Sequence, residues 1–378
     1  MKKIAKRAAV FAALAATSTT VGLTVSAPGA LANSTSRSYA QTNLVSDIPG
    51  LATHTDPNLK NSWGTSTGPG LPIWVSDNAA GVSTLYDGQG NPQPGSGNQQ
   101  LVVSIPPPAS AGAGAAGTPD GTVFNPTTGF AVSNGVASGP SKFLWATEDG
   151  VIAGWNPGVD PTHAVRAVDS SRARDAAGDV GAVYKGLALV STPTASFIYA
   201  TNFRFGTVEV FNSKFEPVNT FTDPTIPAGF APFGIHNIGG KLFVTFAKQD
   251  AFKHDDDAGP GNGFVDVFAP NGDLLRRFAS EGKLDSPWAV TLAPSTFGQF
   301  AGDILVGNFG DGRINAFNPV TGQFLGQLES SHGPLTIDGL WGLRFPAGSL
   351  NVVAGALYFT AGPNHEADGI FGDIVPNS

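Results

Sequence analysis

The sequence has no cysteine in 378 residues, and only 13% of its residues are charged. Without cysteine there is no disulfide framework, no thiolate metal site, no cysteine nucleophile and no lipoprotein anchor. Its single methionine is Met1, so a chain from which N-terminal residues have been cleaved contains no sulfur. Hydrophobic residues make up 41% of the chain. This is enough to bury a large core, which excludes an intrinsically disordered protein.

Glycine and proline are abundant, with 49 and 29 residues. This composition favours many short strands joined by tight turns over long helices. The length allows two or three domains of ordinary size, but all-β folds often run past about 200 residues as one domain.

The first 32 residues have the features of a secretory signal peptide. Four basic residues lie within the first seven positions, an apolar stretch covers 8–25, and Ala30-Leu31-Ala32 forms an A-x-A cleavage site. A membrane anchor is the alternative, disfavoured by the Ala, Thr and Ser content and by Pro28-Gly29. The sequence therefore predicts a signal peptide at 1–32, cleavage near Ala32, and a secreted domain at 33–378.

Cleavage after residue 32 would remove the four basic residues and change the net charge from −8 to −12. An acidic chain of this kind argues against a nucleic-acid partner and against electrostatic docking on anionic lipid. No second apolar run of 18 residues occurs and the C-terminus has no hydrophobic tail, so we expect no membrane insertion and release from the cell.

A strand–turn–strand pattern recurs six times. Each copy has an apolar strand, a polar turn and an alternating strand that usually ends in an aromatic residue. The pairs are 73–78 with 81–86, 144–149 with 150–155, 198–202 with 206–211, 242–246 with 263–268, 304–308 with 312–317, and 357–360 with 369–371.

Ahead of each pair a small residue follows a bulky or charged one. These entry positions are Gly64, Gly121, Gly186, Gly234, Ala289 and Gly342, which lie 48 to 65 residues apart. Four short strands fit such a period, so the sequence predicts an all-β, six-bladed β-propeller. The last repeat lacks an outer strand, which the N-terminal segment 39–45 supplies, closing the ring. A pair of β-sandwiches is the alternative, disfavoured by six copies in phase.

The segment 308–317 resembles an NHL repeat. From about Tyr39 to Phe371 the chain resembles an uncharacterised family of exported bacterial NHL-like propellers. The stretches that carry this resemblance are 41–47, 147–150, 259–268 and 338–345. The resemblance implies the fold and no activity, since none is assigned to that family.

The residues just before the entry positions are the first functional candidates, because inner propeller strands line the central channel. They are Trp63, Asp120, Lys185, Phe233, Trp288 and Trp341. Gluconolactonase-like propellers place cation ligands at similar positions, and here only Asp120 qualifies. The aromatic rings suit stacking on a glycan or a flat metabolite at the channel mouth. Packing between blades is the alternative.

The second candidate is the acidic loop 249–262. Asp255, Asp256 and Asp257 offer oxygen ligands for Ca²⁺, although the loop is not an EF-hand. A solvated acidic loop without metal is the alternative. No cofactor is firmly implied.

Histidines provide the remaining candidates. His365 and Glu366 are adjacent in the turn of the sixth repeat, where a histidine beside an acid suits proton transfer. His236 follows the fourth entry position, either near the channel or as a hydrogen-bonded core residue.

These observations predict a monomeric secreted scaffold. Its site at the channel mouth binds a glycan, a small molecule or a cell-surface protein. A cation-dependent hydrolase or lyase of the gluconolactonase-like type and a structural protein of the cell envelope are the alternatives, because propellers host all three.

Overall fold

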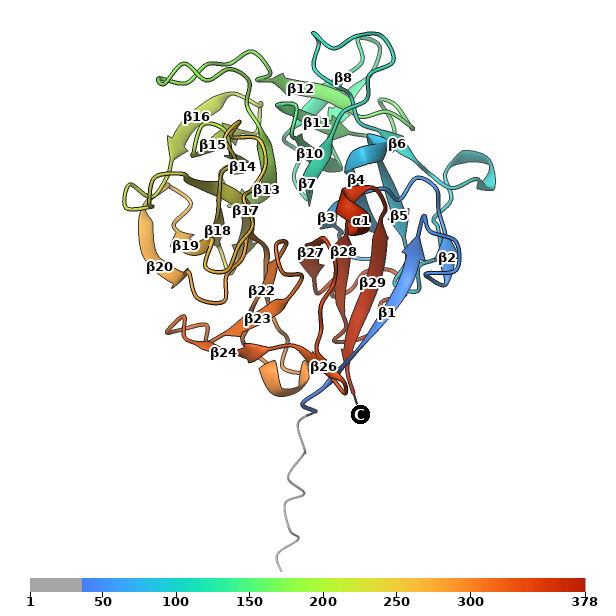
Figure 1. The fold of residues 1–378 in the computed structure, drawn as a ribbon. Coiled ribbons are helices and arrows are strands. Elements are labelled where there is room, and N and C mark those ends of the chain that lie inside the picture. The colour runs from blue at the N-terminus through green and yellow to red at the C-terminus, as the bar shows by residue number, and fades with distance from the viewer. Residues whose placement is uncertain (1–35, 378) are drawn as a thin grey trace, which may run out of the picture. The chain divides into compact units, whose positions relative to one another are not determined.

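Six antiparallel blades of four strands surround one centre in the computed structural model, which describes residues 36–377 (Figure 1). The sheet of the last blade carries a fifth, parallel strand at its outer edge. The predicted signal peptide lies outside the described residues. Within the sheets of blades 1 to 5 the strands follow chain order from the centre outward, as in a propeller blade. The structure confirms the predicted six-bladed propeller.

The first three blades follow one another along the chain. Blade 1 contains β3 (Ser62–Ser66), β4 (Ile73–Asp77), β5 (Val82–Tyr86) and β6 (Val103–Ser104); blade 2 contains β7 (Pro119–Phe124), β10 (Phe143–Thr147), β11 (Val151–Trp155) and β12 (Val165–Asp169); blade 3 contains β13 (Tyr184–Ser191), β14 (Ser196–Asn202), β15 (Thr207–Asn212) and β16 (Pro217–Phe221).

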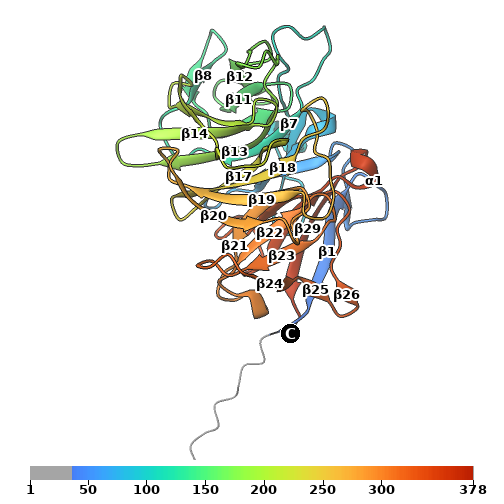
Figure 2. The same ribbon diagram turned by 60° about the vertical axis from the view of Figure 1, so that its left-hand side comes forward.

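The other three complete the ring, and Figure 2 shows successive sheets fanned from green blade 2 to orange blade 5. Blade 4 contains β17 (Phe230–Ile238), β18 (Lys241–Lys248), β19 (Gly263–Phe268) and β20 (Leu274–Ser280); blade 5 contains β21 (Pro287–Leu292), β22 (Ile304–Asn308), β23 (Ile314–Phe317) and β24 (Phe324–Gln327); blade 6 contains β27 (Leu340–Arg344), β28 (Leu357–Ala361), β29 (Ile370–Pro376) and β1 (Tyr39–Ser46).

Smaller elements decorate the blades. The repeat pattern did not predict them, because segments of two to four residues carry no periodicity. They are the parallel addition β2 (His54–Thr55), the hairpins β8 (Ala131–Ser133) with β9 (Ser138–Pro140) and β25 (Glu329–Ser330) with β26 (Gly333–Pro334), and the short helices η1 (Asn78–Ala80), η2 (Ser96–Asn98), η3 (Gly298–Phe300) and α1 (Pro363–Glu366). No helix in the described part of the chain has the length and apolarity needed to cross a membrane.

The two ends of the domain meet in blade 6. β1 pairs antiparallel with β29, from Tyr39 opposite Pro376 to Ser46 opposite Ile370, so the blue and red strands lie side by side in Figure 1. This pairing confirms the predicted N-terminal closing strand. It fills the hydrogen-bonding edge that the last sheet would otherwise leave open.

The entry glycines let neighbouring inner strands approach closely. A Cβ atom at Gly234 would lie 2.0 Å from the Trp288 carbonyl oxygen of the next blade, and one at Gly64 would lie 2.3 Å from the Asp120 carbonyl oxygen. Real Cβ atoms essentially never come within 3.0 Å of such an atom. Glycine is therefore required here for backbone contact between blades.

We expect Gly234→Ala to lower the free energy of unfolding by about 1–3 kcal/mol, because the added methyl group forces blades 4 and 5 apart. Gly112→Ala is the matched control, since nothing lies within 4 Å of its Cβ position. Chemical denaturation of both variants is the measurement. Equal stability of the two would show that the close approach does not constrain the ring.

Candidate functional site

The central channel has two mouths, which the inner strands β3, β7, β13, β17, β21 and β27 define. We call the mouth where these strands begin the start mouth and the mouth where they finish the end mouth. The turns between the second and third strands of the blades lie at the start mouth. The sequence analysis placed its main candidates there.

An aromatic plug closes the channel at the start mouth. Trp63 stacks on Trp341 with ring centroids 3.5 Å apart, and Trp288 meets both edge-on at 6.1 and 5.9 Å. Phe233 lies 5.9 Å from Trp341. None of the four side chains is more than 4% exposed. The rings cover one another, as the packing alternative describes, and present no free face to a ligand.

Lys185 and Asp120 are buried beside this plug. The Lys185 ammonium lies 5.0 Å from the centroid of the Trp63 ring, bonds to Glu148 and lies 3.1 Å from Asp255. Burial opposes its charge, but Glu148 and Asp255 hold the pKa of Lys185 above its usual value. Burial, reinforced by the charge of Glu148, raises the pKa of Asp120 well above its usual range.

The three acids of the 249–262 loop point to different partners. Asp255 contacts Lys185 and His254, Asp257 pairs with Lys248 at 2.6 Å, and burial raises the pKa of Asp256 to about 6. The structure therefore does not bring Asp255, Asp256 and Asp257 together around one point. The loop occupies the residues between β18 and β19, as the sequence predicted.

Within residues 36–377, one group offers three converging metal-ligand side chains: Glu148, His254 and Asp255, whose ligand atoms lie within 4.8 Å of one another. Lys185 already donates to two of them. A divalent cation would have to displace a buried ammonium group from its two carboxylates.

His365 and Glu366 are not brought together as a hydrogen-bonded pair. Glu366 accepts a bond of 2.7 Å from Asn61 Nδ2, and burial raises the pKa of its carboxyl group. His365 is exposed. Both residues have positive φ angles, 55° and 65°, in the tight turn of α1, which separates the two side chains.

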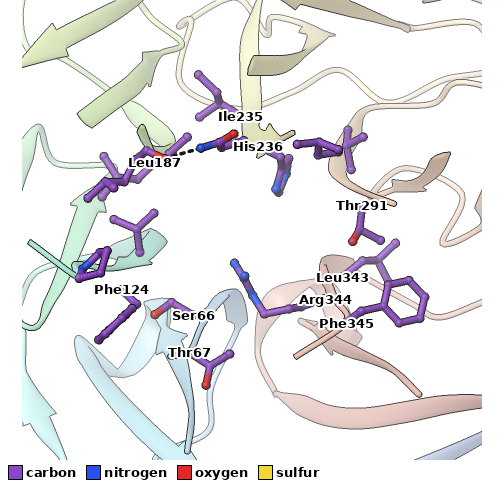
Figure 3. Close-up of a pocket in the computed structure, with 17 residues that line it drawn as sticks. Ser66, Thr67, Phe124, Leu187, Ile235, His236, Thr291, Leu343, Arg344 and Phe345 are labelled. Carbon is purple, nitrogen blue, oxygen red and sulfur yellow. Dashed lines mark hydrogen bonds between the residues drawn. The ribbon is translucent and has the colours of Figure 1, made fainter. Parts of the chain in front are cut away.

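The end mouth is open. A pocket of about 340 Å³ lies there, with walls from the inner strands of all six blades (Figure 3). Phe124, Leu187 and Phe345 supply apolar surface, and no acidic residue lines the pocket. A narrow extension reaches inward along the channel as far as Trp288. The plug is therefore the floor of this pocket.

Arg344 extends into the pocket from β27 (Figure 3). Its Nε atom donates to the Thr65 carbonyl oxygen at 2.9 Å, which fixes the plane of the guanidinium group. Its two terminal nitrogens have no hydrogen-bond partner, and no carboxylate within residues 36–377 pairs with them. Burial lowers the pKa of Arg344 to about 10, so the group keeps its charge at pH 7.

His236 enters the same pocket from β17. Its Nε2 atom lies 3.1 Å from the Trp288 carbonyl oxygen, which only accepts, so Nε2 carries the proton. Burial, with a smaller contribution from Arg344, lowers the pKa of His236 to about 4. The imidazole is neutral at pH 7, and its Nδ1 atom accepts hydrogen bonds. The sequence left open whether His236 faces the channel, and it does.

The sequence reasoning missed Arg344, Ser66 and Thr291. A signal for them exists, because each stands three residues after the bulky or charged residue that precedes an entry position. Six residues have that spacing, and all of them line the pocket: Ser66, Val123, Ala188, His236, Thr291 and Arg344. All but Val123 and Ala188 are polar.

No family model matches the chain. Individual relatives nevertheless place it in a family. Two uncharacterised proteins of Acanthamoeba polyphaga mimivirus are each 32% identical to it, one over 88% of this chain and 78% of its own length, the other over 88% and 84%. The chain belongs to the same family as these proteins. Since they are viral, they give no support to the expected bacterial, exported origin.

Among solved structures, a streptogramin B lyase superposes with a TM-score of 0.51, covering 90% of this chain and 97% of that chain. The two sequences are 13% identical, so the likeness concerns the fold alone.

The low pKa of His236 predicts a pH dependence of stability. The unfolded chain binds a proton near pH 6.5 and the folded chain near pH 4, so stability falls as the pH drops through this window. We expect His236→Asn to reduce that fall by roughly 3 kcal/mol relative to the parent protein. Denaturation between pH 7 and 4 measures both slopes. Identical slopes would contradict the assigned state of His236.

Proposed function

We propose that this member of the family binds a small organic anion in the end-mouth pocket, so that the propeller acts as a binding scaffold. The observation that carries the proposal is Arg344. Its charged guanidinium group extends into a cavity and has both terminal nitrogens free of protein partners within residues 36–377.

A partly buried charge without a counter-ion is unfavourable, because the group gives up hydration and gains no ionic bond. Two other cations avoid this situation: the buried Lys185 meets Glu148 and Asp255, and the half-buried Arg277 meets Asp223 and Asp266. Arg344 has no such ion pair within residues 36–377. A ligand carboxylate or phosphate supplies the missing charge.

The geometry of the guanidinium group also fits an oxyanion. Two parallel N–H donors match the two oxygens of a carboxylate or phosphate, and the bond from Nε to Thr65 holds that fork in one plane. The pocket volume lies in the range of small-molecule sites. Phe124, Leu187 and Phe345 provide contact surface for an apolar body attached to the anionic group.

The net charge of −8 gives a ligand anion no long-range attraction to the protein as a whole. Recognition must then come from close contact with Arg344 inside the pocket. The alternative, a cation-dependent hydrolase or lyase, has weaker support, because Lys185 occupies the group of metal-ligand side chains at the start mouth.

We expect 3-phenylpropionate and phenyl phosphate to serve as probes, with at least one raising the melting temperature of the protein, and raising it further as the concentration increases. Arg344→Gln should weaken binding of that probe by about 10- to 100-fold, since a charge-assisted bond contributes about 1.5–3 kcal/mol.

Arg172→Gln, a change of the same charge at an exposed position, is the matched control and should bind like the parent protein. Isothermal titration calorimetry gives the three affinities. Equal affinity of the parent protein and Arg344→Gln, or no binding of either probe to the parent protein, would contradict the proposed function.

A further inference from the structure

We infer that the ligand of the end-mouth pocket is a hydroxy acid, in which a hydroxyl group lies beside the anionic group. This inference rests on the proposed function and adds the class of ligand. Its basis is that the pocket presents a hydrogen-bond acceptor next to the anion-binding donors. A simple carboxylate would leave that acceptor unused.

The acceptor is Nδ1 of His236. Because Nε2 donates to the Trp288 carbonyl oxygen, Nδ1 carries a lone pair in the neutral ring. Nδ1 has no partner within residues 36–377 and is not sealed away from the pocket. An anionic oxygen cannot donate to it, whereas a hydroxyl group can.

Arg344 and His236 act on the same space. Both line the main pocket and its inward extension, and the charge of Arg344 is felt by the imidazole. Figure 3 shows the two side chains extending into the opening from different sides. A ligand whose carboxylate bonds to Arg344 therefore has its neighbouring atoms within reach of His236.

The other polar side chains of the pocket do not compete for this role. Asn237 donates to the Leu189 carbonyl oxygen and accepts from the Gly240 amide, and the Thr67 hydroxyl bonds to the Pro72 carbonyl oxygen and to Ser349. Thr291 has a hydroxyl with no partner within residues 36–377, which suits a second hydroxyl on the ligand. The Nδ1 atom of His236 only accepts, so it sets the requirement for a donor on the ligand.

The test compares acids that differ only in one hydroxyl group: 3-phenyllactate against 3-phenylpropionate, and malate against succinate. Calorimetry on the purified protein at pH 7 should show the hydroxy acid of at least one pair binding about tenfold more tightly. Equal affinities within both pairs, with binding still dependent on Arg344, would overturn the hydroxy-acid inference and leave the proposed function intact. No binding of any of these acids or of phenyl phosphate would overturn both.

Two variants assign the preference to His236. His236→Gln keeps a donor near the position of Nε2 and lacks an acceptor near Nδ1, so the preference for the hydroxy acid should disappear. His236→Asn keeps an amide near Nδ1, so the preference should persist. A preference unchanged in His236→Gln would overturn the role of Nδ1.

If either variant fails to fold, nitrogen NMR of the parent protein decides the question. The Nδ1 resonance of His236 should shift with 3-phenyllactate and not with 3-phenylpropionate. Equal shifts with both acids would overturn the inference.

Discussion

Close backbone contact between neighbouring inner strands is the constraint on which the rest of this structure depends. At Gly234 and Gly64 the next blade lies where a side chain would begin. The ring can be this narrow only because these positions carry no Cβ atom. A narrow ring brings the residues before the glycines into mutual contact, and this contact forms the aromatic plug.

The plug makes the two mouths of the channel unequal. At the start mouth the Trp63 and Trp341 rings stack on each other, and the Lys185 ammonium group pairs with Glu148 and Asp255. At the end mouth the inner strands leave a pocket in which Arg344 and His236 have side-chain nitrogens without a hydrogen-bond partner in residues 36–377. The aromatic side chains thus pack together at the start mouth, and the pocket lies at the end mouth.

The fold was predictable because it repeats. Six copies of one pattern fixed the number of blades, and the missing outer strand of the last copy identified β1 as the closing strand. The bounds of the 249–262 loop were also predicted correctly. Export of the chain, its monomeric state and its glycan or cell-surface partners stay predictions.

The candidate site was only partly predictable. The sequence correctly predicted that Trp63, Trp288 and Trp341 lie at the channel. Whether their aromatic rings face a ligand or one another depends on the diameter of the propeller, which no local sequence pattern encodes. Arg344 was not predicted, because the sequence candidates were the residues just before the entry positions and Arg344 lies two residues beyond Gly342. Asp255, Asp256 and Asp257 are adjacent in the chain, yet tertiary contacts with Lys185 and Lys248 turn Asp255 and Asp257 toward different partners.

The most direct test of this account is a crystal structure of the protein with bound 4-bromomandelate, using the anomalous signal of bromine to locate the ligand. The account predicts a bromine peak in the end-mouth pocket, with the carboxylate on Arg344 and the hydroxyl on His236. A bromine peak at the start mouth against Trp63 and Trp341, with the end-mouth pocket empty, would contradict it.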